Sequence, residues 1–254
     1  MFREIFLVLL LSHIIGDFYL QTEKLAKKKE KNFTYLCLHG LLYWISFLLI
    51  SLPILSLELF LCGLGMGLIH LIIDFIKYVA VCSKNKKKNL STSDKRSIYI
   101  LDQAVHITCL VIGSYVLAIM NYDIKILDCC KDFFVVTGIS AVKVVNIIVA
   151  LLLIHKPANI TISHLISAYK PKKDLSDQQP QDYNAGRFIG SVERIIMLIL
   201  LYLGQYSAIG LVLTAKSIAR YDEIAKNKIT AEYYLLGTLI STGFVIVVSI
   251  LIRL

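Results

Sequence analysis

The sequence predicts an all-α, polytopic membrane protein with about seven transmembrane helices, since each such helix needs about 20 mostly apolar residues. Hydrophobic residues make up 57% of the 254-residue chain, and the mean hydropathy is +0.69. Both values are typical of integral membrane proteins. The apolar segments that predict the helices are Ile5–Leu20, Phe33–Leu52, Ile54–Cys82, Ile98–Met120, Phe133–Ile154, Ile195–Thr214 and Tyr233–Ile252.

The first segment, Ile5–Leu20, is short, and His13 and Asp17 interrupt its apolar run. No small-residue cleavage site follows it, so we interpret it as a retained helix rather than a signal peptide. The second helix ends near Pro53, in a turn without basic residues, and a lysine-rich loop separates the third from the fourth. A mildly acidic loop precedes the fifth helix, and a long polar segment separates it from the last two.

Basic residues in the loops predict the orientation, because cytoplasmic loops carry an excess of Lys and Arg. The first and third loops are basic, which places the N-terminus outside and residues 156–187 inside. The formal net charge of +9 then reflects attraction to anionic lipid. We favour this explanation of the lysine runs over nucleic-acid binding. The basic loop residues are Lys24, Lys27, Lys28, Lys29 and Lys31, then Lys84, Lys86, Lys87, Lys88, Lys95 and Arg96.

We divide the chain into a five-helix membrane domain (residues 1–155), a polar cytoplasmic linker (156–187) and a C-terminal helical membrane region (188–254). After the linker the positive-inside rule and the count of spans disagree. One further span would put the next basic segment outside, whereas its charge predicts a cytoplasmic location. The motif GQYSAIG, Gly204–Gly210, offers a re-entrant hairpin as the alternative. Such irregular backbone is tolerated where it is buried in protein or lines a cavity.

Seven ionisable side chains lie at one predicted depth in the first four helices. Three His/Asp pairs are each spaced four residues apart, so the members of each pair share one helix face. At 1.5 Å of rise per residue, all of them fall about 8–18 Å from the inner face of the membrane. The seven are His13, Asp17, His39, His70, Asp74, Asp102 and His106.

This set predicts a divalent metal, most simply zinc, because imidazole nitrogen and carboxylate oxygen are its ligands. Inward-facing pairs with this spacing build metal sites in helical bundles, and a metal offsets the cost of burying charge. The candidates exceed the ligands of one zinc, so either some orient ligands from outside or two metals are present. The alternatives are a structural hydrogen-bond and ion-pair network and a proton or ion relay.

A bound metal lowers the pKa of a water molecule, and a neighbouring carboxylate then serves as general base. Asp17, Asp74 and Asp102 are the candidates for that catalytic role. At this depth the ester, amide or phosphate bonds of lipids lie within reach. The sequence therefore predicts a metal-dependent hydrolase that acts on a lipid or membrane-embedded substrate near the cytoplasmic leaflet. The alternatives are an ion- or proton-coupled transporter and a non-enzymatic membrane scaffold.

We also make predictions for two residues that neighbour the cluster, Gly16 and Lys77. Gly16 precedes Asp17, and its small size would let another helix approach closely. Lys77 lies one turn beyond Asp74, and we expect its long side chain to extend to the inner headgroups.

A second group of basic residues predicts contacts to anions or lipid headgroups. Arginine suits bidentate recognition of such groups, and Lys143 falls in the middle of the fifth predicted helix, too deep to reach the surface easily. The alternative for the group is interfacial anchoring. It comprises Lys143, Arg187, Arg194, Lys216 and Arg220.

The motifs HIIGDFYLQ, HGLLY, HLIIDFIK and LDQAVH occur in this order in the first half, and GRFIGSVER, GQYSAIG, AKSIAR and EYYLLGT in the second. Together they resemble the bacterial membrane-protein family catalogued as domain of unknown function 3307, over most of the chain. The resemblance implies a multi-pass protein of the bacterial cytoplasmic membrane and supplies no activity. The placement of His and Asp in helices is also similar to membrane-bound metal-dependent hydrolases, including ceramidase-like ones.

Overall fold

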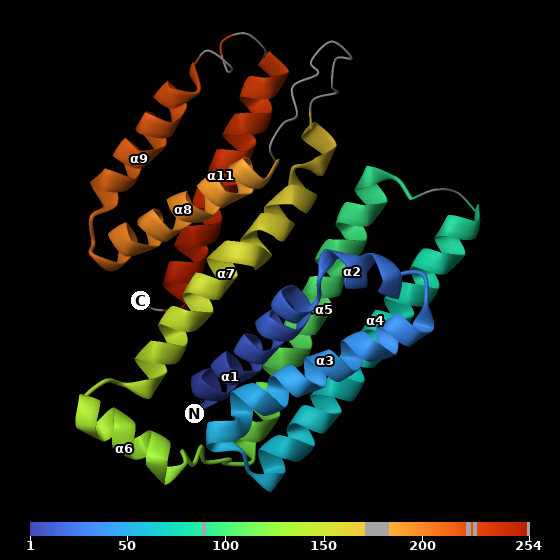
Figure 1. The fold of residues 1–254 in the computed structure, drawn as a ribbon, viewed down its shortest axis with the longest axis vertical. Coiled ribbons are helices and arrows are strands. Elements are labelled where there is room, and N and C mark those ends of the chain that lie inside the picture. The colour runs from blue at the N-terminus through green and yellow to red at the C-terminus, as the bar shows by residue number, and fades with distance from the viewer. Residues whose placement is uncertain (88–89, 171–182, 222–224, 226–227, 253–254) are drawn as a thin grey trace. The chain divides into compact units, whose positions relative to one another are not determined.

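The computed structural model describes residues 1–87, 90–170, 183–221, 225 and 228–252. Within these ranges every regular element is a helix (Figure 1), which confirms the predicted all-α fold. Lys88 of the predicted basic loop and residues 171–182 of the predicted linker lie outside the described residues.

Five helices in the described part of the chain are long and apolar enough to cross a membrane, or up to six if a bent pair near the N-terminus is one span. The expected total of about seven is not reached. One reason is that the predicted segment Ile195–Thr214 is divided between two helices, the second of which has only 14 residues. The five candidate spans are Phe33–Ile54, Leu57–Ser83, Thr92–Ile119, Ala141–Leu165 and Lys228–Ile252.

The chain forms two compact units, Met1–Val149 and Ala150–Leu254, and each is described by itself. In the first unit α1 packs against α3 and α5, and α4 packs against the same two helices (Figure 1). The short helix α2 packs on α3. The bounds are α1 (Phe2–Ile14), η1 (Ile15–Leu20), α2 (Glu23–Lys29), α3 (Phe33–Ser51), η2 (Leu52–Ile54), α4 (Leu57–Lys87), α5 (Thr92–Ile119) and α6 (Asp128–Thr137).

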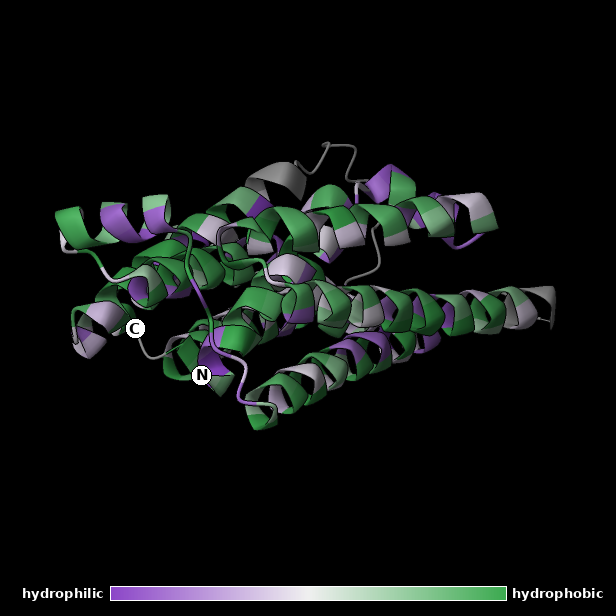
Figure 2. Cartoon of the chain, turned by 90° about the horizontal axis from the view of Figure 1, so that it is seen from below, coloured by the Kyte–Doolittle hydropathy of each residue, from purple (hydrophilic) through white to green (hydrophobic). Residues whose placement is uncertain are grey.

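The first unit buries polar side chains and exposes apolar ones. Leu49, Leu61 and Leu68 keep 65%, 58% and 60% of their surface exposed, and hydrophobic residues colour most of the helix surfaces in Figure 2. The buried residues include Ile5 and Leu110 but also histidines and aspartates. A helical bundle in lipid places ionisable groups on its interior in this way.

The end of the first helix departs from regular α geometry. Ile15–Leu20 forms a π-helical turn, η1, and the chain then bends by 92° into α2. A Cβ atom on Gly16 would lie 2.8 Å from Tyr43 Cδ2 and 2.9 Å from Ser46 Oγ, so only glycine allows this approach of η1 to α3. Ser46 Oγ also donates to the Ser12 carbonyl at 3.0 Å. The close helix contact expected at Gly16 is therefore present, and π-turns of this kind are frequent at functional sites.

The fifth predicted helix, Phe133–Ile154, is wrong in its bounds. α6 ends at Thr137 and is capped by Gly138, which has a left-handed φ of 67°, and α7 (Ala141–Leu165) begins after it. Lys143 consequently lies in the first turn of α7, where it is exposed, and not in the middle of a span. The physical reason is that glycine adopts a left-handed conformation without strain and so ends helices.

The second unit contains the rest of α7, η3 (Ser167–Tyr169), α8 (Tyr183–Tyr202), α9 (Tyr206–Ala219) and α11 (Lys228–Ile252). α8 packs against both α9 and α11. Ala158 and Ile162 of α7, with Ile166 just after it, form a buried core with side chains of α11. Lys156 to Leu165, which we expected in a linker, continue α7. The chain breaks between α8 and α9 at Gly204, which has a φ of 70°, as the re-entrant alternative requires.

Candidate metal centre

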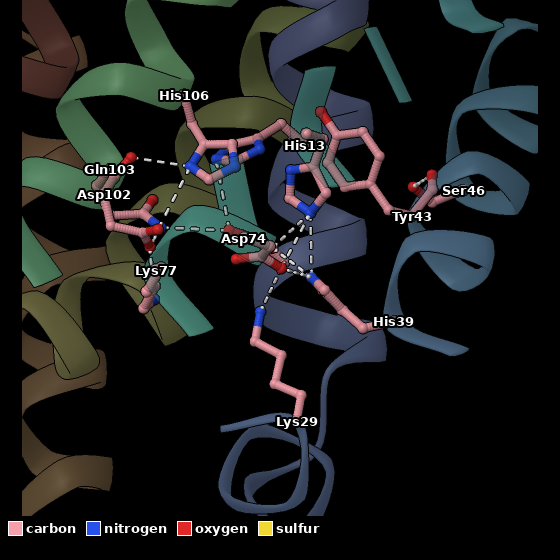
Figure 3. A network of polar contacts seen from close by, with 12 residues as sticks. His13, Lys29, His39, Tyr43, Ser46, Asp74, Lys77, Asp102, Gln103 and His106 are labelled. Carbon is pink, nitrogen blue, oxygen red and sulfur yellow. Dashed lines mark hydrogen bonds and ion pairs between the residues drawn. The ribbon is translucent and has the colours of Figure 1, made fainter. Parts of the chain in front are cut away.

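The structure brings the seven predicted site residues together in the first unit. The helices α1, α3, α4 and α5 and the π-turn η1 each contribute at least one of them, and every one is at most 8% exposed. Figure 3 shows the cluster, with the side chains labelled His13, His39, Asp74, Asp102 and His106 directed toward one another. Their common location follows from helix spacing, and their role as metal ligands stays a prediction.

Four ligand atoms of the cluster form a compact group. His39 Nε2 lies 3.0 Å from Asp17 Oδ1 and 3.2 Å from Asp74 Oδ2. His70 Nε2 lies 3.5 Å from the same Asp17 atom and 3.7 Å from the same Asp74 atom. The two Nε2 atoms are 3.1 Å apart. Because zinc binds nitrogen and oxygen at about 2.0–2.1 Å, the corners of its tetrahedron are about 3.3 Å apart, and these separations bracket that value.

His39 Nε2 makes more close polar contacts than its hydrogen can serve. An imidazole carries at most one hydrogen on Nε2, and His39 Nε2 lies within 3.2 Å of atoms of Asp17, Asp74 and His70. A cation among these atoms would remove the repulsion between them. The Nδ1 atoms of His39 and His70 have no hydrogen-bond partner among the described residues, so the outer contact that usually orients a ligating imidazole is not seen at either.

A second set of three ligand atoms lies beside the first. Oxygen or nitrogen atoms of Asp74, Asp102 and His106 lie within 4.8 Å of one another, as do those of Asp17, His39 and His70. The distances above place Asp74 near the first set as well. Two His/Asp groups in the described residues are therefore arranged so that each can hold a metal ion.

Sequence reasoning missed Lys29, which we assigned to a basic cytoplasmic loop. α2 turns this side chain inward, where it is 7% exposed and donates to Asp74 Oδ2 at 2.8 Å (Figure 3). The one available signal was that Lys29 follows Leu25 by four residues, and these two form the buried face of α2. A run of lysines hides such a signal, because most of its members face solvent.

Lys77 does not extend to the headgroups as expected. Its Nζ atom donates to Asp102 Oδ2 at 2.8 Å. Gln103, which we did not single out, donates to Asp17 Oδ2 at 3.2 Å. Two ammonium groups therefore face the three buried carboxylates, and with neutral imidazoles the cluster retains one net negative charge.

Aromatic stacking fixes the orientation of several rings. Tyr43 stacks on His70 with ring centroids 3.7 Å apart and planes within 8°, and His13 stacks on His106 at 5.4 Å. His13 Nε2 lies 3.9 Å from Asp17 Oδ2, too far for a hydrogen bond. His13 therefore serves mainly as a packed wall of the cluster in this structure.

The predicted anion-binding residues occupy several different environments. Arg187 is exposed, Lys216 pairs with Glu193 at 2.5 Å, and the Arg220 guanidinium lies over the ring of Tyr234. Arg194 is the buried member, at 2% exposure. Lys143 belongs to the first unit and the other four to the second, so their joint role stays a prediction.

Arg194 is held by neutral acceptors. Nη1 donates to Ser241 Oγ at 3.2 Å, and Nη2 donates to Asn159 Oδ1 at 2.6 Å and to Ser191 Oγ at 3.3 Å. Nε donates to the carbonyl oxygen of Ile154, one turn before Pro157, whose ring crowds the helical carbonyls that precede it. The guanidinium thus links α7, α8 and α11.

The protein-family model described as "Protein of unknown function (DUF3307)" matches residues 5–127 of the chain. All seven residues of the cluster lie inside this segment, as do Lys29 and Lys77. No match was found among the curated proteins, and none among the solved structures.

Proposed function

Residues 5–127 belong to the family of unknown function DUF3307, and from the geometry inside this segment we propose an intramembrane metal-dependent hydrolase. Its metal is a divalent ion, zinc in the first instance, and its substrate is a lipid or a membrane-embedded molecule near the cytoplasmic leaflet. We propose the cytoplasmic membrane of a bacterium as its location.

A single observation carries the proposal, namely the four ligand atoms at separations of 3.0 to 3.7 Å around His39 and His70. The separations of the two imidazole nitrogens from each other and from the two carboxylate oxygens are close to those between ligands of one zinc ion. The single hydrogen that His39 Nε2 can carry serves only one of its three close contacts, whereas a cation at this place would bind all four ligand atoms.

Asp17, His39 and His70 are the three ligands that come from three different elements, η1, α3 and α4. A catalytic zinc site keeps three protein ligands and one open position. A water molecule binds there, and the metal lowers its pKa. Asp74 Oδ2 lies beside these three ligands, 3.2 Å from His39 Nε2, and is also held by Lys29. Its carboxylate is therefore placed to accept a proton from that water, as a general base does.

The surroundings of the cluster support a membrane-embedded substrate. The outward faces of α3 and α4 expose large apolar side chains, including Leu49 and Ile76, which suit contact with acyl chains. The short helix α2 brings lysines to the same end of the bundle as Asp74. Basic side chains there favour anionic headgroups.

A structural ion-pair network is the second candidate, and a specific observation favours it. Lys29 and Lys77 each bind one carboxylate at 2.8 Å, which is the geometry of satisfied ion pairs. A network of this kind requires no metal, and the same pairs suit ion-coupled transport. A measurement of metal content distinguishes the structural network and the ion-coupled transporter from the metal-dependent hydrolase.

The test is quantification of bound metals in detergent-purified protein prepared without chelators. We expect close to stoichiometric metal in the wild type and in His155→Ala, an exposed histidine of the second unit, and loss of metal in His70→Ala. Circular dichroism of each variant checks that the helices remain. A wild-type protein free of metal would contradict the proposal, as would a His70→Ala protein that keeps its metal.

A further inference from the structure

We propose that Asp74, Asp102 and His106 form a second divalent-cation position beside the first, so that the centre holds two metals with Asp74 between them. The proposal rests on the proposed function, since it adds a metal to that site. It is carried by a different observation, the unpartnered ligand atoms on α5.

His106 presents a ligand atom. Its Nδ1 lies 2.8 Å from the carbonyl oxygen of Asp102, one turn back in α5, and it must carry the hydrogen because a carbonyl can only accept. In the neutral ring this leaves Nε2 with a free lone pair, the tautomer that binds metals. Nε2 has no hydrogen-bond partner among the described residues, although His106 is only 3% exposed.

Asp102 presents a second ligand atom in the same manner. Its Oδ2 accepts a hydrogen bond from Lys77 at 2.8 Å, while Oδ1 is buried with no partner in the described part of the chain. The Lys77 contact thus fixes one oxygen and leaves the other free. Leaving a buried carboxylate oxygen and a buried imidazole nitrogen unpaired destabilises the folded protein, and a cation between them removes that cost.

Asp74 joins the two positions. Its carboxylate takes part in the second set of ligand atoms, and its Oδ2 lies 3.2 Å from His39 Nε2 in the first. A carboxylate with two oxygens can bind one metal with each. Two-metal centres of hydrolytic enzymes hold their ions about 3.5–4 Å apart with ligands shared in this way.

The charged side chains near the two metal positions predict which position binds its ion more tightly. The cluster holds three carboxylates and the ammonium groups of Lys29 and Lys77, so the first divalent cation already gives it net positive charge. A second cation enters against that charge in a buried site, where repulsion is strong. We therefore expect the second metal to bind more weakly than the first.

The test is equilibrium dialysis of the full-length protein in detergent against increasing zinc, with metal counted per chain. We expect two zinc ions in the wild type and in His155→Ala, filled in two steps, and one zinc ion in His106→Ala. His106→Gln, closer in size, repeats the measurement should the alanine variant unfold, and thermal melting identifies a folded protein.

The outcomes separate the two proposals. A wild type that saturates at one zinc overturns the second position and leaves the proposed function standing. Two zinc ions retained in a folded His106 variant overturn the assignment of His106 as a ligand. A wild type that binds none overturns the proposed function, and the second position with it. Manganese loading provides an independent readout, because spin coupling between two ions is expected in the wild type and not in His106→Ala.

Discussion

The His/Asp cluster of the first unit and the Arg194 network of the second both bury charge, yet they differ in how that charge is satisfied. Arg194 donates four hydrogen bonds to neutral acceptors, and all of its nitrogens are used. In the cluster, by contrast, Asp102 Oδ1 and His106 Nε2 have no hydrogen-bond partner among the described residues.

This difference distinguishes a structural network from a candidate ligand site. Buried polar groups in folded proteins are nearly always hydrogen-bonded, so a guanidinium bonded through all three of its nitrogens is explained by the helices that it joins. Unpaired atoms that face one another in a buried cluster are explained by a ligand that accepts their lone pairs. The comparison can be tested by changing each region and measuring both stability and metal content.

The largest expected effect on stability is that of Arg194→Ala. The variant leaves Asn159, Ser191 and the Ile154 carbonyl without their donor, and we expect a loss of about 3 kcal/mol or more. Metal content per folded chain should not change. Thermal melting in detergent gives the first quantity and metal analysis the second, with the exposed Arg187→Ala as control. An unchanged melting temperature would show that Arg194 does not hold the second unit together.

His39→Ala should have the largest effect on metal affinity, a loss of about 100-fold or more, since removing even an outer partner costs up to about that much. In chelator-treated protein the same change should be close to neutral, because it relieves the crowding of acceptors around Nε2. Dialysis and melting measure the two effects, with His155→Ala as control. A large loss of stability without any metal would favour the structural network instead.

Gly16→Ala should lower stability by about 1–3 kcal/mol, the range for overpacking. Its Cβ atom would meet Tyr43 Cδ2 at 2.8 Å, which pushes η1 and Asp17 away from α3. Gly65→Ala is the matched control, because nothing lies within 4 Å of the added atom and alanine in a helix interior is better by about 0.5–1 kcal/mol. Equal melting temperatures for the two variants would contradict the close approach at Gly16.

Lys29→Met should have the smallest effect, an increase of metal affinity of about tenfold. The ammonium group bonds Asp74 Oδ2, and removing its positive charge favours a cation nearby. Lys24→Met, exposed on the same helix, should leave the affinity unchanged in dialysis. A weaker affinity in Lys29→Met would mean that Lys29 positions Asp74 as a ligand rather than competing with the metal.

The sequence sufficed to predict the cluster but not its details. Pairs such as His70 and Asp74 share a helix face because of the helical repeat, and the loop charges set a common depth, so convergence of the seven side chains was predictable. The inward turn of Lys29 depends on a bend of 92° before α2, which composition does not reveal. The division of the fifth predicted helix at Gly138 was likewise hidden, because a glycine in an apolar run is compatible with a continuous helix.

The unpaired state of His106 Nε2 also lay beyond sequence reasoning. It depends on which nitrogen faces the Asp102 carbonyl, a contact of 2.8 Å that spacing alone does not specify. In the second unit, Arg194 was expected to contact anions, whereas it is enclosed by neutral acceptors supplied from helices far apart in the chain.

X-ray absorption at the zinc edge of metal-loaded protein tests the central claim most directly. The account predicts nitrogen and oxygen neighbours at about 2.0–2.1 Å, with the outer-shell scattering of imidazole, and a marked decrease of the imidazole signal in the variant that combines His39→Ala with His70→Ala. A spectrum with oxygen neighbours alone, or one with sulfur, would contradict the assignment of the metal to this cluster.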